Sequence, residues 1–154
     1  MFTSTSIEIA ASPAEVKAVF FDWSSYPLWA KSQLQSIEQL SPRSKVVADT
    51  TIQKGDRLRI TVGGMSFRST VTGFSEEAFS WIGKIPLLVA GEHTFRFLPS
   101  QVTPGGTTFI NGEVFTGALA LPFLFGGNKD GVSQGDQPFD RFNRELKARV
   151  ESLL

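Results

Sequence analysis

The order of apolar and polar positions along the chain predicts a largely antiparallel β protein. Successive side chains of a strand point to opposite faces, so a half-buried strand alternates with a period of two. Gly63-Gly64 and Ser75-Glu76-Glu77 are turn signals between neighbouring segments of this kind. The segments that alternate are Thr3–Ala10, Gln35–Leu40, Asp56–Val62, Met65–Phe74, Ala78–Ile85, Leu88–Leu98 and Thr107–Leu119.

The central strands are expected to have one dry face and one wet face, as antiparallel sheets commonly do. The dry positions are Leu58, Ile60, Val62, Met65, Phe67, Ser69, Val71, Phe79 and Trp81. The wet positions are Arg57, Arg59, Thr61, Arg68, Thr70 and Thr72.

Helices are predicted near both ends of the chain. Ser12 caps the first helix, Pro13 suits its first turn, and Glu15 completes a capping box. Asp22–Pro27 then breaks this helix before a second short one through residues 28–30. The closing helix starts at Pro138 and packs an apolar stripe onto the sheet, formed by Phe139, Phe142, Leu146, Val150 and Leu153.

The remaining stretches are predicted to be irregular. Arg43–Thr51 is a polar link, and the glycines of Pro122–Gln137 indicate a flexible loop. The apolar stretch Leu119–Phe125 has two readings. It is either a ligand gate or weak membrane-touching edge, or the end of a strand tucked under the last helix.

Three polar residues interrupt an aromatic face on the last two strands. His93, Asn111 and Glu113 share their faces with Phe95, Phe97, Phe109 and Phe115. Burial of an unpaired carboxylate or imidazole is costly. These groups therefore either satisfy each other, meet water in a cavity, or meet a ligand.

The aromatic residues suggest how these two strands pair if Pro99–Gly106 is a hairpin loop. A hairpin that sets Phe97 opposite Phe109 also sets His93 opposite Glu113. Directly opposed side chains have Cβ atoms about 4.5–5.5 Å apart, within reach of an imidazole–carboxylate hydrogen bond. A slip of two residues would give His93 to Asn111 instead, and a slip of one would turn an aromatic face to solvent.

Composition narrows the classes of function. Lys and Arg together number 15, as do Asp and Glu, so the basic patch of a nucleic-acid-binding protein is missing. Fourteen Phe and three Trp provide an aromatic interior that can fill a core or line an apolar pocket. The absence of Cys excludes disulfides and thiolate sites, and a single His argues against a metal site.

A length of 154 residues suits one domain, expected to span residues 1–154. The N-terminus lacks a basic region followed by an apolar core, which argues against a secretory signal. The longest apolar stretch is far shorter than the roughly 20 residues that span a bilayer. We therefore expect a cytoplasmic protein without stable membrane insertion.

Short segments along nearly the whole chain carry a resemblance to a known family. They are Ser12–Val16, Trp23, Tyr26–Trp29, Gly91–Phe95, Gly106–Phe109, Glu113–Gly117 and Phe142–Lys147. In this order, with a meander between short helices and a terminal helix, they resemble the START-related helix-grip superfamily. Within it, the chain looks like a member of the polyketide cyclase/dehydrase and lipid-transport family.

The resemblance implies an α+β fold in which a curved antiparallel sheet wraps a long C-terminal helix around an internal cavity. It implies an activity less firmly, because the family includes cyclases, dehydratases, carriers of lipids and quinones, and metabolite binders. Residues 128–136 look like an insertion relative to the family pattern. The insertion is either a lid over the cavity mouth or a disordered segment.

The candidate catalytic residues are His93, Glu113 and Asn111. A carboxylate in an apolar cavity has a raised pKa, so Glu113 can act as an acid or base near neutral pH, with His93 as its proton-exchange partner. Asn111 can orient a ligand carbonyl or enolate. The structural alternatives are a glutamate at the wet rim or tied to a neighbouring strand, a core histidine satisfied by Glu113, and an asparagine paired with the backbone.

The candidate ligand-binding residues form an aromatic wall, and core packing is the alternative for each of them. They are Trp29, Phe67, Trp81, Phe95, Phe109, Phe115 and Phe142. The glycine clusters do not match a phosphate-binding loop, so no nucleotide cofactor and no metal are expected.

Two functions remain open from the sequence. The first is a cofactor-independent cyclase, dehydratase or isomerase acting on a hydrophobic, carbonyl-rich small molecule. The second is a non-catalytic carrier or sensor of a lipid, quinone or other apolar metabolite. A protein-interaction module would instead show an exposed apolar patch, and the sequence leaves the oligomeric state undetermined.

Overall fold

The computed structural model describes residues 2–40, 46–47, 51–85, 89–116 and 138–154. In chain order, the elements are β1 (Phe2–Ile9), α1 (Pro13–Phe21), the 3-10 helix η1 (Trp23–Ser25), α2 (Tyr26–Trp29), β2 (Leu34–Leu40), β3 (Val46–Val47), β4 (Arg57–Val62), β5 (Met65–Phe74), β6 (Ala78–Ile85), β7 (Val89–Pro99), β8 (Thr107–Thr116) and α4 (Pro138–Glu151). The predicted order of strands and helices is confirmed. The expectations for Leu119–Phe125, for the loop Pro122–Gln137 and for the insertion at residues 128–136 lie outside the described residues.

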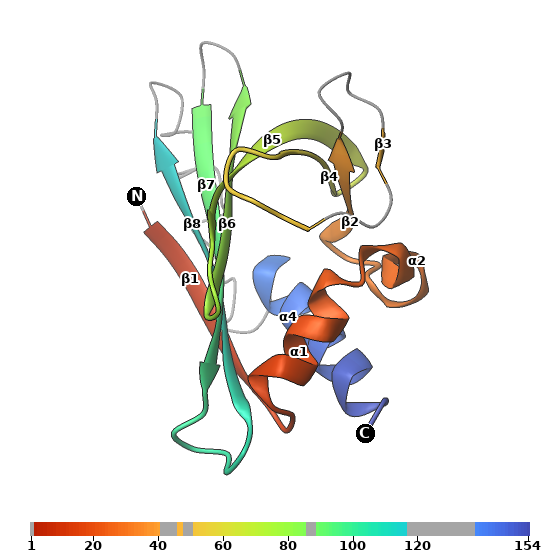
Figure 1. Ribbon diagram of the computed structural model, residues 1–154, viewed down its shortest axis with the longest axis vertical. Helices are drawn as coiled ribbons and strands as arrows, with labels where there is room; N and C mark the ends of the chain where they lie inside the picture. The colour runs from red at the N-terminus through yellow and green to blue at the C-terminus, as the bar shows by residue number, and fades with distance from the viewer. Residues whose placement is uncertain (1, 41–45, 48–50, 86–88, 117–137) are drawn as a thin grey trace, which may run out of the picture.

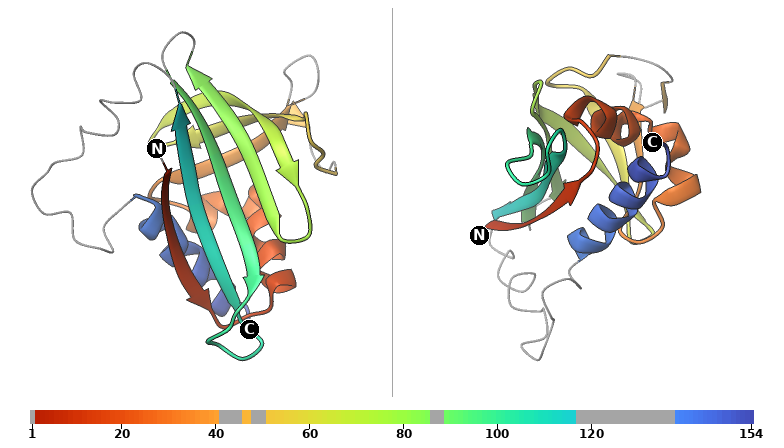
Figure 2. Two further views of the ribbon diagram at one scale, coloured as in Figure 1. Left: turned by 90° about the vertical axis from the view of Figure 1, so that its left-hand side faces the viewer. Right: turned by 90° about the horizontal axis from the view of Figure 1, so that it is seen from below.

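The strands of the described ranges form one eight-stranded sheet in the order β1-β8-β7-β6-β5-β4-β2-β3. All neighbouring strands run antiparallel. The sheet is strongly curved, so that β5, β4 and β2 bend over the helices while β1, β8, β7 and β6 stand beside them (Figure 1). Helices α1 and α4 lie on the concave side (Figure 2). This is the helix-grip arrangement expected from the resemblance.

The start of α1 is set by local chemistry. Ser12 Oγ accepts a hydrogen bond from the Glu15 amide, and the Glu15 carboxylate accepts one from the Ser12 amide at 2.7 Å. This reciprocal pair is the predicted capping box, which satisfies two amides that a helix start leaves open. The helix therefore begins at a fixed point and directs Val16 and Phe20, both fully buried, towards the sheet.

The core lies between α1, α4 and the middle of the sheet. Phe20 of α1 is surrounded by rings from three strands, with centroids 4.8 Å from Phe95, 5.2 Å from Phe97, and 6.1 Å from both Phe79 and Phe109. All five side chains are fully buried or nearly so. A ring cluster of this kind combines large apolar burial with favourable edge-to-face contacts.

Helix α4 buries one stripe, as its sequence pattern predicts. Phe142, Leu146 and Val150 are at most 2% exposed. Leu153 does not join them, because it lies beyond the end of the helix at Glu151 and is 58% exposed. Phe139 is half-buried at the other end of the stripe.

Two expectations for the meander need correction. Met65 was expected on the dry face but is 75% exposed, since it follows the tight Gly63-Gly64 turn at the end of a hairpin. The segment Arg43–Thr51, expected to be a polar link, contains the short strand β3, which pairs with Gln39 and Leu40 of β2.

Candidate functional site

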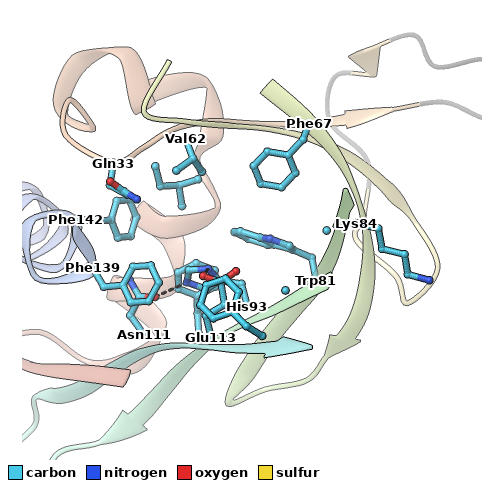
Figure 3. A pocket seen from close by; sticks show the side chains of 15 residues that line it. Gln33, Val62, Phe67, Trp81, Lys84, His93, Asn111, Glu113, Phe139 and Phe142 are labelled. Atoms are coloured by element: carbon cyan, nitrogen blue, oxygen red, sulfur yellow. Dashed lines mark hydrogen bonds and ion pairs between the residues drawn. The ribbon is translucent and has the colours of Figure 1, made fainter. Parts of the chain in front are cut away.

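A cavity of about 290 Å³ opens on the concave side of the sheet (Figure 3). The described residues that line it are Gln33, Leu34, Val62, Phe67, Trp81, Gly83, Lys84, Gly91, His93, Phe95, Asn111, Glu113, Phe115, Phe139 and Phe142. Most of these are apolar. Ligand pockets typically measure about 300–1,000 Å³ and combine apolar walls with a few polar groups. The cavity therefore has the character of a site for a small ligand.

The predicted register of β7 and β8 is confirmed. His93 is paired with Glu113, Phe95 with Asn111, and Phe97 with Phe109. All three polar residues of the aromatic face consequently lie on the inner side of the sheet and line the cavity.

The hydrogen bond of His93, however, goes to the diagonal neighbour. His93 Nε2 lies 2.5 Å from Asn111 Oδ1, whereas His93 Nδ1 lies 3.8 Å from Glu113 Oε2. The second distance is longer than a hydrogen bond. The imidazole and the carboxyl group thus face each other across a short gap, and the direct hydrogen bond allowed by the register is not formed.

Ring packing explains this orientation. The imidazole stacks on Phe95, with centroids 4.5 Å apart and an interplanar angle of 17°. Trp81 and Phe139 contact it from β6 and α4, with centroids at 5.3 Å and 4.9 Å. Since Phe95 stands opposite Asn111, a ring that stacks on Phe95 directs its Nε2 towards Asn111.

Asn111 connects the histidine to helix α4. Its side chain is 1% exposed, and its Nδ2 donates a hydrogen bond to Asn143 Oδ1 at 3.0 Å. Asn143 is also 1% exposed. Buried amides of this kind are stable only when hydrogen-bonded, so the pair fixes both side chains.

Burial lowers the pKa of His93 to about 4, and the hydrogen bond with Asn111 opposes this only partly. The cause is desolvation, which disfavours the charged form of any group taken out of water. The imidazole is therefore neutral at pH 7, and one of its two ring nitrogens carries a lone pair.

Burial raises the pKa of Glu113 to about 7 by the same effect acting on an acid. The side chain is 19% exposed at the cavity wall. Both the protonated and the ionised form of Glu113 are therefore accessible near neutral pH. A carboxyl group poised in this way can both accept and donate a proton.

Two glycines on neighbouring strands make room for this arrangement. Gly83 and Gly91 are paired in β6 and β7, and both line the cavity. A Cβ atom on Gly91 would collide with Glu113 Oε1, and one on Gly83 would lie 2.9 Å from the Phe67 ring. The Glu113 carboxyl group therefore lies over Gly91 and the Phe67 ring over Gly83, where a larger residue would crowd them.

The predicted aromatic wall is formed only in part. Phe67, Trp81, Phe95, Phe115 and Phe142 line the cavity, and their contact with a ligand stays a prediction.

Trp29 and Phe109 are not among the described lining residues, and their predicted place in the wall is corrected. Trp29 fills the space between α2 and α4, with its ring 4.7 Å from Tyr26 and 5.7 Å from Phe142. Phe109 is fully buried beneath Phe20.

Sequence reasoning missed several residues of the site. No motif or periodicity in the sequence singled out Asn143 as a site residue, although it follows Phe142 of the buried stripe. Phe139 had been assigned to the helix stripe and not to the cavity. Gln33 and the paired glycines become visible only when the strands are brought together.

Neither a metal site nor a membrane span is found in the part of the chain that the structure describes. No three residues among its His, Asp and Glu side chains cluster closely enough to hold a metal ion. None of its helices is long and apolar enough to cross a membrane.

The curved sheet, the helix that it wraps and the apolar cavity define a helix-grip fold. The chain belongs to the polyketide cyclase/dehydrase and lipid transport family, whose model matches residues 3–151. No curated protein matches it in sequence.

Solved structures support the fold. A START superfamily protein from Mycobacterium smegmatis is 18% identical with a TM-score of 0.62, and 99% of each chain is covered. A hypothetical protein from Helicobacter pylori is 12% identical with a TM-score of 0.71, covering 97% of this chain and 88% of that one. Norcoclaurine synthase from Thalictrum flavum, in complex with dopamine and hydroxybenzaldehyde, is 11% identical with a TM-score of 0.65, covering 99% and 87%. At these identities, the likeness concerns the fold alone.

Proposed function

We propose that the protein binds a small, uncharged, apolar molecule that carries a carbonyl group, and that it moves a proton on this molecule. The reaction would be a cyclisation, dehydration or isomerisation without a cofactor. One observation carries the proposal: a neutral imidazole and a carboxyl group with a pKa of about 7 share one wall of an otherwise apolar cavity.

The chemistry follows from the two protonation states of Glu113. As a carboxylate, it takes a proton from a carbon next to the carbonyl group, and the electron pair of the C–H bond moves to the carbonyl oxygen to give an enolate. As an acid, Glu113 then returns the proton to another carbon, or to a hydroxyl group that leaves as water. Proton transfer of this kind typically contributes a factor of about 10²–10⁴.

His93 and Asn111 support this exchange. The imidazole is neutral, so it places no positive charge beside Glu113 that would stabilise the carboxylate and lower the pKa of Glu113 below about 7. The hydrogen bond with Asn111 holds the ring in place. This assigns Asn111 to the histidine and withdraws it from direct orientation of the ligand.

The shape of the cavity supports a compact ligand. A volume of about 290 Å³ is at the lower end of the usual range for ligand pockets. Trp81, Phe67 and Phe115 offer flat faces on which a ring can stack. A structural neighbour with this fold holds dopamine and hydroxybenzaldehyde, which are both small aromatic molecules.

A carrier or sensor of an apolar metabolite is the second candidate. The family description includes lipid transport, and most residues of the cavity wall are apolar. Such a protein would need the cavity but not the proton exchange, so binding and turnover must be measured separately.

The test uses 5-nitrobenzisoxazole, a small flat molecule that reports a positioned base. A base removes its C–H proton, the N–O bond breaks, and a coloured nitrophenolate with a nitrile group forms without any other reactant. We expect the protein to accelerate this reaction, with a rate that rises as the pH passes about 7. Glu113→Gln should lower the rate by a factor of about 100.

Glu92→Gln is the matched control, since Glu92 lies on the same strand as His93 but is exposed. It should react like the unmodified protein. Equal rates for Glu113→Gln and the unmodified protein would refute the catalytic proposal. Native mass spectrometry of the gently purified protein would then show whether a small molecule is carried along, as the second candidate requires.

A further inference from the structure

Two buried amides on different elements form a directed hydrogen-bond chain that ends on the only histidine of the sequence. Asn143 of α4 accepts from Asn111 of β8, and Asn111 in turn faces His93 of β7. The three residues come from separate parts of the fold. Neither the strand pairing nor the helix packing requires this chain, because apolar side chains could fill the same positions.

The direction of the chain has a chemical consequence. An amide donates through its nitrogen and accepts through its oxygen. Since Asn111 Nδ2 is used to donate to Asn143 Oδ1, the Oδ1 atom of Asn111 is the one that lies 2.5 Å from His93 Nε2. An oxygen acceptor at this position requires a proton on Nε2.

A neutral imidazole carries a proton on only one nitrogen. With Nε2 protonated, Nδ1 carries the lone pair, and this nitrogen faces Glu113 Oε2 at 3.8 Å. The pair then holds a single exchangeable proton, on the carboxyl group or on the substrate. Glu113 is the only acidic group among the described lining residues, and Lys84 is exposed with a side chain that leads away from the ring cluster (Figure 3).

We propose that Asn143 is a positioning residue: through Asn111 it holds His93 as the Nε2–H tautomer, with the Nδ1 lone pair facing Glu113. The role of this tautomer in proton transfer rests on the proposed function, whereas the tautomer itself does not. Asn143 does not line the cavity, and its hydrogen bond goes to Asn111. It therefore acts on the reaction only through Asn111 and His93.

The opposite direction is chemically distinct and can be recognised. If both amides were turned over, Asn143 Nδ2 would donate to Asn111 Oδ1, and Asn111 Nδ2 would donate to His93 Nε2. The proton of the ring would then lie on Nδ1 and point at Glu113. Asn143 Nδ2 is buried without a hydrogen-bond partner among the described residues, so the two directions differ in which amide atom stays unpaired.

Nitrogen NMR of the full chain with ¹⁵N-labelled histidine decides between them. Because the sequence contains one histidine, the spectrum contains a single imidazole ring, and its two nitrogens differ in chemical shift according to which one is protonated. We expect the Nε2–H pattern at pH 6–8. An Nδ1–H pattern in the unmodified protein would overturn the proposal.

Asn143→Leu tests the part played by the helix residue. Leu has a similar size but cannot accept a hydrogen bond, so Asn111 is free to rotate and the preference for Nε2–H should fall about tenfold, the factor that one net hydrogen bond is worth. Val150→Ala, which removes packing elsewhere on α4, should leave the tautomer unchanged. An unaltered tautomer in Asn143→Leu, or an equal change in Val150→Ala, would contradict the assigned role.

Asn143→Asp offers a rescue, since a carboxylate also accepts from Asn111 Nδ2 and should restore the Nε2–H pattern. Should Asn143→Leu fail to fold, the unmodified protein and this variant still decide the matter. A correct tautomer in a protein that does not convert 5-nitrobenzisoxazole would leave the positioning role intact and refute only the proposed function.

Discussion

The same two strands build a solid core at one end and a hollow at the other. At one end of the β7–β8 ladder, Phe97 and Phe109 are paired and covered by Phe20 of α1. Four residues further along each strand, the pair His93 and Glu113 faces the cavity. The strand geometry is the same in both places, so the difference comes from what covers the sheet and from the size of the side chains around it.

The two regions differ in the side chains that lie above the sheet. Phe20 fills the space above the aromatic pair, whereas Gly83 and Gly91 stand on the sheet near the polar pair and bring no side chain into the space. Interiors are packed to a density that leaves few voids. The hollow of about 290 Å³ beside the dense ring cluster therefore forgoes packing that the cluster makes, and it is the place where we propose that a ligand binds.

The largest effect is expected for large-to-small changes in the solid region. Phe109→Ala should lower the free energy of unfolding by about 3–5 kcal/mol, because it leaves a void among packed rings. Phe115→Ala, the matched change in the hollow region, should lower it by less than about 1 kcal/mol because part of that ring already borders the cavity. Urea denaturation of both variants measures this, and similar losses would show that the two ends of the ladder are packed alike.

The next effect concerns the buried carboxyl group. The pKa of Glu113 is higher in the folded chain, about 7, than the usual 4.5, so the folded state loses stability as the pH rises through this range. Glu113→Gln removes that loss and should be more stable than the unmodified protein by on the order of 2 kcal/mol at pH 8. Denaturation at pH 4 and pH 8 tests this, and no gain at pH 8 would mean that the carboxylate is well solvated.

The histidine gives an effect of similar size, with stability falling towards acid pH instead of towards alkaline pH. Its pKa in the folded chain is about 4 against the usual 6.5, so protonation in the unfolded state costs stability as the pH falls from 6.5 towards 4. In His93→Phe, the free energy of unfolding should fall less between pH 6.5 and pH 4, by about 1–3 kcal/mol. Its stability at pH 7 should also drop, since Asn111 Oδ1 loses a partner, and an unchanged acid slope would place the histidine in contact with water.

The smallest effect is expected at Gly91. Ala in a strand is usually better than Gly by roughly 0.5–1 kcal/mol, but here a Cβ atom would collide with Glu113 Oε1. Gly91→Ala should therefore destabilise the unmodified protein slightly and stabilise the Glu113→Ala variant, a coupling of about 1 kcal/mol. A double-mutant cycle in urea measures it, and additive effects would show that the glycine does not position the carboxyl group.

Much of the framework could be predicted from local pattern. The capping box at Ser12, the Gly63-Gly64 turn and the period-two strands are set by short-range chemistry. The register of β7 and β8 was predictable up to a slip of two residues, because both alignments keep the aromatic faces inside, and the structure has the one that pairs Phe97 with Phe109. His93 and Glu113 were placed opposite each other by the same reasoning.

The contacts within the site were not predictable in this way. The sequence suggested that His93 and Glu113 could be hydrogen-bonded, yet ring stacking on Phe95 turns the imidazole towards Asn111. Phe109 was expected at the cavity but is covered by Phe20, a residue nearly 90 positions away. Strand periodicity gives the face of a side chain but not the element that covers it.

The sequence by itself determined most of the elements, their order and the aromatic faces, because these depend on short-range periodicity and on turn chemistry. Only the tertiary structure decided where the sheet is filled and where it is hollow. The pKa values of His93 and Glu113 and the partner of Asn111 depend on desolvation and on contacts between β8 and α4. These properties arise from distances in space between residues that the chain keeps far apart.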